Sequence, residues 1–224
     1  QLLPTLKQHQ ALVIKSVFSH LVASEDASLD HFTNQQAKDF ENACLKIQQF
    51  VGYSFIKHLS NSAAIFRHPD LQNDMVRLGI GLYGVAAQDN DLDLQTVATL
   101  RTTIAQIRLV KAGESIGYNR KGILSEDSLI ATVRIGYADG YSRKFSNGVG
   151  KMFINGSLAP VVGNVCMDMT MLNITHIQNV HEGNEVEVFG ANLPVEKIAK
   201  WADTIPYEIL TGISQRIKRV YYEE

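Results

Sequence analysis

Short apolar segments alternate with helical segments over residues 1–86, and this alternation constrains the fold more than any other feature of the sequence. Residues 12–19 are rich in β-branched and aromatic side chains, which predicts a buried strand. A helix with an apolar stripe follows, with a Thr-x-x-Gln capping box at Thr33 and a stop at Gly52. The pattern is typical of parallel β/α units, in which functional residues gather at the carboxyl ends of the strands. Two further strands are predicted in this part, at residues 54–56 and 75–84.

Beyond an acidic segment at residues 88–93, the pattern changes to strands and tight turns. Asn155-Gly156 between two apolar runs is the strongest hairpin signal in the chain. Pro194 and Pro206 each suit the first turn of a short helix. We therefore expect a mostly antiparallel β domain after the boundary. Its strands are predicted at residues 97–110, 129–133, 152–154, 161–163, 167–172, 186–189 and 217–222.

The composition narrows the class of protein. Apolar residues make up 45 % of the 224 residues, and a net charge of −2 with no basic block argues against a nucleic-acid partner. No apolar run reaches the roughly 18–20 residues that span a bilayer, and no signal-peptide pattern is present, so we expect no membrane contact. Two cysteines, Cys44 and Cys166, are typical of a reducing compartment such as the cytoplasm. We expect no metal site, and a chain that opens in the middle of a fold.

Three segments carry candidate chemistry. Ser62 at a predicted helix start, together with backbone N–H groups freed by the glycines near Arg77, is typical of a phosphate-binding site. Residues 163–169 begin with a glycine and place small and soft side chains in a row. Residues 136–140, Gly-Tyr-Ala-Asp-Gly, predict a tight turn, since glycine tolerates positive φ and Asp hydrogen-bonds its own backbone. Tyr137 on that turn is suited to proton transfer, with a packed aromatic at a strand end as the alternative.

In this order and spacing, five segments resemble alanine racemase, the fold-type III enzyme that depends on pyridoxal 5'-phosphate (PLP). The segments are residues 61–64, 75–84, 136–140, 162–168 and 207–219. The resemblance implies an α/β plus all-β protein. Residues 1–90 then form the C-terminal part of a PLP-binding (β/α)₈ barrel, and residues 91–224 form the C-terminal β domain.

The resemblance also implies a two-base reaction, in which a proton leaves one face of the substrate Cα and returns to the other. Tyr137 matches one base. A phenol has an ordinary pKa of about 10, so the family places cationic groups near it. The other base is the lysine that carries the cofactor, in a family segment ending Tyr-Gly-His-Gly that nothing here resembles. We therefore expect these 224 residues alone not to racemise alanine.

The family's cofactor contacts are carried over residue by residue. Arg77 matches the arginine that faces the pyridine nitrogen, and because a guanidinium stays protonated, that nitrogen remains unprotonated. The ring is then a weaker electron sink, which suppresses transamination. His20 matches the histidine beside the ring, and His58 one that links His20 with Arg77. The phosphate contacts match Ser62, Gly79, Ile80 and Tyr207.

The substrate side is carried over in the same way. The backbone N–H of Met167 matches a substrate-carboxylate contact, with Cys166 and Asp168 on either side of it. Tyr118 and Arg120 are weaker candidates for the approach to the site. In this family the tyrosine and the methionine act on the cofactor of the other subunit, which predicts a homodimer with shared active sites.

Two alternatives remain beside interconversion of L-alanine and D-alanine for peptidoglycan synthesis. One is another fold-type III amino-acid racemase, such as a serine or broad-specificity enzyme. The other is a non-catalytic dimerisation or binding module of a multi-domain cell-wall enzyme. Intact Tyr137, Arg77, Ser62 and Tyr207 favour an enzyme, because a retired site has no need of all four.

Overall fold

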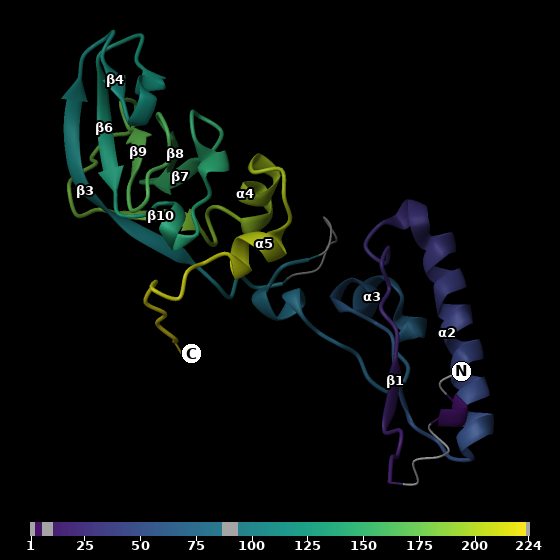
Figure 1. The fold of residues 1–224 in the computed structure, drawn as a ribbon. Coiled ribbons are helices and arrows are strands. Elements are labelled where there is room, and N and C mark those ends of the chain that lie inside the picture. The colour runs from purple at the N-terminus through teal and green to yellow at the C-terminus, as the bar shows by residue number, and fades with distance from the viewer. Residues whose placement is uncertain (1–2, 6–10, 87–93, 223–224) are drawn as a thin grey trace. The chain divides into compact units, whose positions relative to one another are not determined.

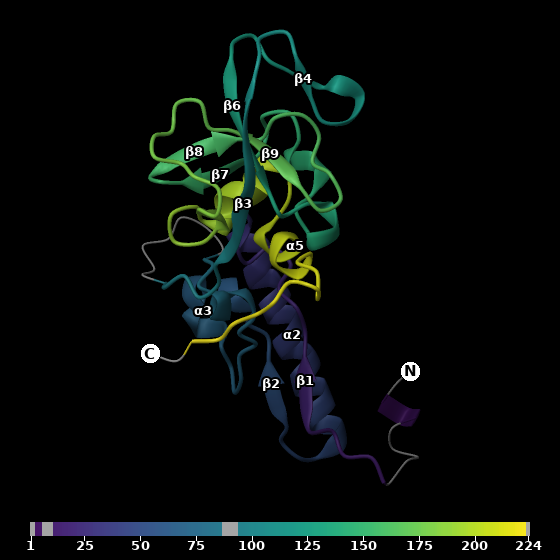
Figure 2. The same ribbon diagram turned by 90° about the vertical axis from the view of Figure 1, so that its left-hand side faces the viewer.

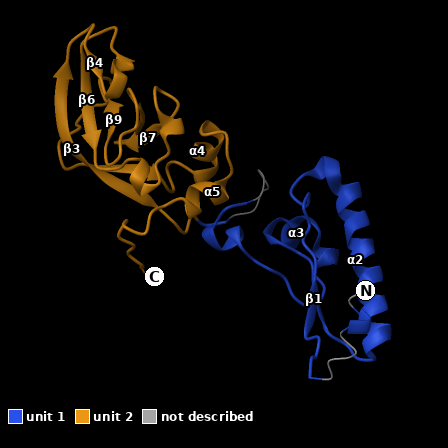
Figure 3. Ribbon diagram, in the orientation of Figure 1, with its two compact units in different colours: residues 1–95 blue, residues 96–224 orange. Residues whose placement is uncertain are grey.

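The computed structural model describes residues 3–5, 11–86 and 94–222. The chain divides into two compact units, residues 1–95 and 96–224 (Figure 3). The acidic segment at residues 88–93, where the sequence predicts the domain boundary, lies outside the described residues. Each unit has its own buried apolar cluster and is described by itself.

The first unit is a pair of parallel strands covered by a long helix. Strands β1 (Ser16–Phe18) and β2 (Ile56–His58) pair in register, Ser16 with Ile56 and Phe18 with His58. Helix α2 (Asp30–Val51) lies along them (Figures 1 and 2). Its stripe packs Phe40 and Cys44 against Leu21, Leu59 and Ala64, so the apolar face predicted from the sequence is the face that covers the strands.

Helix α2 begins at Asp30, four residues before the start that a cap at Thr33 predicts. Asp26 accepts the backbone N–H of Ser28 and caps the short helix η1 (Ala27–Leu29), which runs directly into α2. Thr33 therefore lies inside the helix, fully buried, and the predicted capping box is wrong. The predicted stop is confirmed, because Gly52 ends the helix with a φ of 80°.

The first strand is shorter and more exposed than predicted. Leu12, Val13 and Phe18 are 59 %, 57 % and 65 % exposed, so the expectation of a buried strand at residues 12–19 is wrong. Among the described residues, β2 is the only strand that pairs with β1, so one face and one edge stay open. The strand predicted at residues 75–84 is also absent. Met75 makes one bridge to His58, and the chain then turns into the short helix η3 (Ile80–Tyr83).

Helix α3 (Ser62–Arg67) follows β2, and of the two residues that the sequence offers as its cap, Asn61 and Ser62, the structure uses Asn61. The side chain of Asn61 accepts the backbone N–H of Ala64 at 3.0 Å. Arg67 at the other end of α3 donates to both carboxylate oxygens of Asp30, at 3.0 and 3.1 Å, which fastens α3 to the first residue of α2. The short helix η2 (Pro69–Leu71) completes this part.

The second unit is built on a six-stranded antiparallel sheet with the order β8-β7-β10-β3-β6-β9 (Figure 1). A bridge between Val161 and Leu172 joins the two ends, so the sheet is nearly closed. Its interior is filled by side chains such as Met152, Val133 and Val186, all fully buried. The strands are β3 (Leu100–Val110), β6 (Ser128–Val133), β7 (Lys151–Ile154), β8 (Ser157–Pro160), β9 (Thr170–Asn173) and β10 (Glu185–Phe189).

Local turn chemistry accounts for the connections of this unit. Asn155 and Gly156 have φ of 44° and 81° and join β7 to β8, as predicted for an Asn-Gly hairpin. Pro194 immediately precedes helix α4 (Val195–Trp201), and Pro206 begins helix α5 (Pro206–Thr211). A small hairpin, β4 (Ser115–Ile116) and β5 (Gly122–Ile123), encloses the short helix η4 (Tyr118–Arg120). Two further short helices, η5 (Tyr137–Asp139) and η6 (Arg143–Phe145), follow β6.

One predicted strand of the second unit is wrong. Residues 217–222 form no strand, because this apolar and aromatic run pairs with no other segment of the described chain and its tyrosines, Tyr221 and Tyr222, are 86 % and 87 % exposed. The other predicted strands lie in the sheet or beside it, with shifted ends. Within the described residues, no helix is both long and apolar enough to cross a bilayer.

Candidate functional site

Arg77 is the centre of a polar cluster at the carboxyl ends of β1 and β2. Its Nη1 lies 3.1 Å from Nδ1 of His58 and donates to the carbonyl of the same residue at 3.1 Å. Its Nη2 donates to the carbonyls of Ser19 and Leu59, at 2.8 and 3.2 Å, and lies 3.3 Å from Nδ1 of His20. Both terminal nitrogens of the guanidinium are therefore fully engaged.

The cluster fixes the hydrogen positions on both imidazole rings. A guanidinium only donates hydrogen bonds, so the Nδ1 atoms of His20 and His58 accept, and each neutral ring carries its proton on Nε2. Phe18 stacks on the ring of His58 with centroids 5.2 Å apart, and the guanidinium of Arg77 lies 5.5 Å from the Phe18 centroid. Arg77 itself, rather than His58, is the residue that contacts both other members.

A second cluster in the same unit forms a seat for an anion. The Oγ of Ser62, a buried residue, accepts the backbone N–H groups of Gly79 and Gly81, at 2.9 and 3.4 Å. The Ser62 hydroxyl thus keeps its own proton for another acceptor. The backbone N–H of Ile80 has no acceptor among the described residues, although the residue is 5 % exposed. The Ser62 hydroxyl and the free Ile80 amide together suit a phosphate group.

In the second unit, Tyr137 occupies a turn held firmly against a neighbouring loop. The N–H groups of Tyr137 and Ala138 donate to the carbonyls of Cys166 and Met167, at 2.9 and 3.0 Å. A Cβ on Gly136 would lie 2.3 Å from the Cys166 carbonyl oxygen, so only glycine fits there. Tyr137 is 44 % exposed, so its phenol faces outward and is not a packed aromatic of the core.

The same loop carries the predicted substrate contact. Met167 is 54 % exposed, and its backbone N–H has no acceptor among the described residues. Tyr137 and Met167 therefore present a phenol and a free amide from two segments joined by backbone hydrogen bonds. Cys166 is half-buried, and burial raises the pKa of its thiol, which keeps the group neutral.

Arg216 is the residue of this region that the sequence did not reveal. Its Nε donates to Asp139 at 2.7 Å, and its Nη2 donates to Asp168 at 2.5 Å. These partners lie 77 and 48 residues away in the sequence, so no local pattern connects them. The only sequence signal was the position of Arg216 within the segment 207–219.

Three other predicted residues lie elsewhere in the second unit. Tyr207 is in the first turn of α5 and is 46 % exposed. Tyr118 begins η4 and is 71 % exposed, and Arg120 in the same turn donates to the hydroxyl of Ser115 at 2.9 Å. Tyr207 belongs to the second unit, whereas Ser62 belongs to the first.

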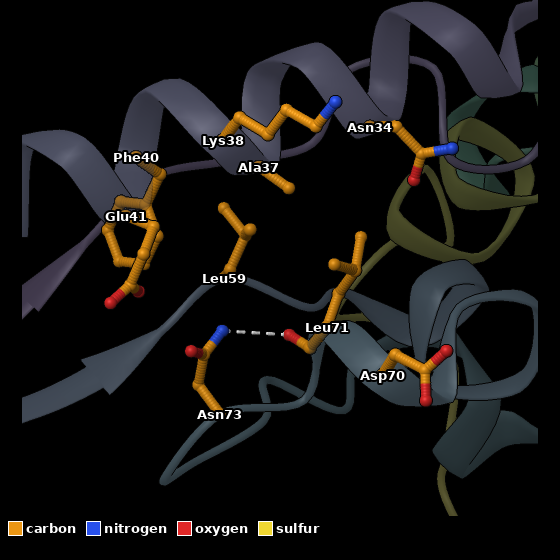
Figure 4. A pocket seen from close by; sticks show the side chains of 9 residues that line it. All are labelled: Asn34, Ala37, Lys38, Phe40, Glu41, Leu59, Asp70, Leu71 and Asn73. Atoms are coloured by element: carbon orange, nitrogen blue, oxygen red, sulfur yellow. Dashed lines mark hydrogen bonds between the residues drawn. The ribbon is translucent and has the colours of Figure 1, made fainter.

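The first unit also contains a hollow of about 480 Å³ that none of the candidate residues lines. Helix α2 contributes Lys38 and Phe40, and Leu59 and Leu71 face them, as Figure 4 shows. The described residues contain no group of three or more histidine, cysteine or acidic side chains placed to hold a metal ion.

Comparison with known proteins assigns both parts of the chain. Residues 97–221 match the family model for the alanine racemase C-terminal domain, and residues 1–87 match that for the N-terminal domain. The chain belongs to the alanine racemase family. A curated alanine racemase of Clostridium tetani is 37 % identical over 219 residues, which is 94 % of this chain and 56 % of that protein.

Solved alanine racemases share the fold. The enzyme of Bartonella henselae, described with covalently bound pyridoxal phosphate, has a TM-score of 0.87 at 33 % identity, over 98 % of this chain and 61 % of that one. The enzyme of Clostridium difficile 630 in complex with cycloserine has a TM-score of 0.85 at 36 % identity, over 96 % of this chain and 58 % of that one. The expected fold class, the C-terminal part of a (β/α)₈ barrel followed by an antiparallel β domain, is confirmed. The chain spans a little over half the length of these alanine racemases.

Proposed function

We propose that this chain is the part of a PLP-dependent alanine racemase that holds the cofactor and carries the tyrosine base. In this proposal residues 1–90 belong to the PLP-binding barrel, and residues 91–224 form the C-terminal β domain. The enzyme interconverts L-alanine and D-alanine, and the D-alanine serves peptidoglycan synthesis. We place it in the cytoplasm, where both free cysteines, Cys44 and Cys166, stay reduced.

The observation that carries the proposal is the state of Arg77. Five contacts engage Nη1 and Nη2, but Nε has no partner among the described residues and is not buried from solvent. One N–H of a permanently charged group is thus left to face an aromatic nitrogen. His20 lies beside it, suited to the side of the ring. The donors therefore fit the pyridine end of PLP.

The other end of PLP fits the second cluster. A phosphate needs donors without competing carboxylates, and the Ser62 hydroxyl with the Ile80 amide supplies them. Arg77 lies two residues before Gly79, whose N–H donates to Ser62, so one short segment before η3 contributes to both clusters and links them. When bound, PLP withdraws electrons from the substrate Cα and makes its proton removable.

Tyr137 has the position of a base that moves this proton. Its turn is braced by two backbone hydrogen bonds to the Cys166–Met167 carbonyls, so the phenol is held by a rigid support. The free amide of Met167 is suited to a substrate carboxylate, which orients Cα before proton transfer. The exposed phenol and amide face outward from their unit, and this supports a homodimer in which they act on the cofactor of the partner subunit.

The test is racemisation by the full-length protein with PLP, followed in both directions by chiral chromatography. We expect Tyr137→Phe to lower kcat by about 100-fold or more, because a general base contributes about 10²–10⁴-fold. PLP affinity should not change, because the phenol is no part of either cofactor cluster. Tyr222→Phe, an equally conservative change at a side chain 87 % exposed, is the matched control.

Two results would overturn parts of the proposal. Absence of alanine interconversion by the full-length protein with PLP would reject the activity, and turnover of serine in its place would assign a different racemase. The 224 residues alone are expected to be inactive, since the lysine base is missing. Sustained racemisation by them would refute the assignment of that base.

A further inference from the structure

Arg216 joins the two segments that carry the phenol and the free amide. Its guanidinium donates one hydrogen bond to Asp139, two residues after Tyr137, and another to Asp168, the residue after Met167. The side chain of Asp139 is 8 % exposed, whereas that of Asp168 is 54 % exposed. One arginine therefore connects a buried carboxylate inside the turn with a carboxylate on the outer loop.

The buried carboxylate is itself part of the turn. Its Oδ2 accepts the backbone N–H of Gly136 at 2.9 Å, while its Oδ1 accepts Nε of Arg216. The C-terminal segment also reaches the turn through its backbone, because Ser214 N–H donates to the carbonyl of Asp139 at 3.0 Å. A Cβ on Gly140 would lie 2.5 Å from the carbonyl oxygen of Gly212, so the two segments are in close contact.

Arg216 stays positively charged in the folded protein. Hydrogen bonds to Asp139, and then to Asp168, raise the pKa of the guanidinium further above its ordinary value, so it remains protonated at every working pH. Each partner accepts through one oxygen from a different nitrogen of the guanidinium, Nε for Asp139 and Nη2 for Asp168, which uses the forked donor set of arginine. A lysine ammonium at the same place has a single nitrogen and cannot reproduce the two directions.

We propose that Arg216 is a positioning residue for the racemase reaction, which clamps the Tyr137 turn to the Met167 loop and so fixes the distance between the proton-transferring phenol and the substrate-binding amide. The inference rests on the proposed function. The side chain of Arg216 bonds to Asp139 and Asp168, and through them it acts on the phenol and the amide. An error of about 1 Å in such a spacing costs about 100-fold in rate.

The experiment compares Arg216→Ala, Arg216→Lys and Arg101→Ala in the full-length protein with PLP. Arg101 is the matched control, because it pairs with Glu185 on the exposed face of the same unit at 3.0 Å and lies outside the clamp. For Arg216→Ala we expect kcat for alanine to fall about 100-fold. Arg216→Lys should lose less, and Arg101→Ala should match the wild type.

Two further readouts separate positioning from general damage. Hydrogen exchange measured by mass spectrometry should quicken about tenfold at residues 136–141 and 166–169 of Arg216→Ala, while the β3–β6 ladder keeps its protection. PLP affinity should change little, because Arg77 and Ser62 lie in the other unit and the side chain of Arg216 bonds to Asp139 and Asp168. If Arg216→Ala does not fold, Asp168→Asn weakens only the bond between Arg216 and residue 168. This variant should exchange faster at residues 166–169 and lose part of its kcat.

The outcomes are distinguishable. Retention of kcat within about twofold in Arg216→Ala, or loss of kcat with unchanged exchange in both segments, would overturn the clamp. For Asp168→Asn, wild-type exchange and kcat would overturn it as well. A wild-type protein that does not racemise alanine rejects the proposed function, and the exchange measurement still decides whether Arg216 holds the two segments together.

Discussion

The backbone N–H of Tyr137 donates to the carbonyl oxygen of Cys166 at 2.9 Å, and this bond joins two segments that lie far apart in the sequence. A second hydrogen bond, from the N–H of Ala138 to the carbonyl oxygen of Met167, joins the same two segments. These backbone bonds, together with the hydrogen bonds of Arg216 to Asp139 and Asp168, leave the turn little freedom to tilt and so fix the base of the phenol.

Gly136→Ala tests this close approach. The φ of Gly136 is −151°, so the backbone conformation itself accepts alanine, but the new Cβ would lie 2.3 Å from the Cys166 carbonyl oxygen. The turn must move away from the loop, which should lower the free energy of unfolding by about 1–3 kcal/mol. Racemase activity should fall by about 100-fold, because the phenol moves with the turn.

Gly113→Ala is the control for this variant. Gly113 has a φ of 82° and no atom within 4 Å of an added Cβ, so alanine there introduces backbone strain without a clash. It should lower stability by about 1 kcal/mol and leave kcat unchanged. Equal losses of kcat in the two variants would show that the close contact at Gly136 is unimportant for the reaction.

Ser62→Ala tests the phosphate seat. The substitution removes the hydroxyl that accepts the Gly79 amide at 2.9 Å and that is left to donate to the phosphate. We expect PLP affinity to fall about tenfold or more, since a hydrogen bond to a charged group contributes about 1.5–3 kcal/mol. Equilibrium titration with PLP, monitored by absorbance, measures this.

Ser60→Ala provides the matched comparison for the phosphate seat. Ser60 is equally buried, but its hydroxyl donates to the carbonyl of Leu71 at 2.8 Å. This variant should lose stability and keep wild-type PLP affinity. An undiminished affinity in Ser62→Ala would place the phosphate elsewhere.

Tyr141→Phe is expected to stabilise the protein. The Tyr141 hydroxyl is buried and has no hydrogen-bond partner among the described residues, while the ring stacks on Phe145 at 4.4 Å. Removal of an unpaired buried hydroxyl should raise the free energy of unfolding by about 1 kcal/mol. Denaturant titration at neutral pH measures the change. Tyr53→Phe, which deletes the acceptor of the Ile14 amide, should have the opposite sign or no effect.

The same substitution should also change the response to alkali. Burial raises the pKa of the Tyr141 phenol, whereas in the unfolded chain the group ionises near the ordinary value of 10.0. The free energy of unfolding is therefore unaffected by ionisation of this group below pH 10, and it falls as the pH rises above 10, because the phenol then ionises only in the unfolded chain. Relative to Tyr141→Phe, the wild type should lose up to about 1.4 kcal/mol per pH unit there. A constant difference up to pH 11 (about one unit above the ordinary value) would contradict this.

Glu187→Gln tests a buried carboxylate in the sheet. Oε1 of Glu187 accepts the N–H groups of Asn192 and Leu193, at 2.8 and 2.9 Å, and Oε2 accepts the Asn192 side chain. An amide turns one of these acceptors into a donor, so stability should fall by about 1–3 kcal/mol in denaturant titration. Glu185→Gln on the same strand removes only an exposed ion pair and should cost less than about 1 kcal/mol. Equal effects would contradict the buried role.

Features with a local cause could be predicted from the sequence. The Asn155-Gly156 hairpin, the stop at Gly52 and the cap at Asn61 follow from backbone preferences of single residues, and the structure confirms them. Burial of residues 12–19 was predicted wrongly, because exposure depends on which strands pair with them. The strand predicted at residues 217–222 was wrong for the same reason, because apolar composition alone does not supply a pairing partner.

The residues of the candidate site also differ in whether a local sequence signal identifies them. Ser62 and Tyr137 stand out because a glycine or a cap lies beside each of them in the sequence. Arg216 does not, because its two carboxylates are brought to it by the fold, 77 and 48 residues away. The contacts of Arg77 with Ser19 and His20 span 58 and 57 residues. The family resemblance related His20 to Arg77 only through His58, and nothing in the sequence indicated the contact with Ser19.

The carbonyl groups around Arg77 make cofactor binding depend on correct folding of the first unit. They come from Ser19, His58 and Leu59, so the two terminal nitrogens of the guanidinium find their acceptors only after two neighbouring strands have met at their ends. A chain whose strands are misaligned leaves the guanidinium in water, with no fixed direction for a ring nitrogen. The yellow absorbance of bound vitamin B6 should therefore report the fraction of the protein in which this strand pair is correctly assembled.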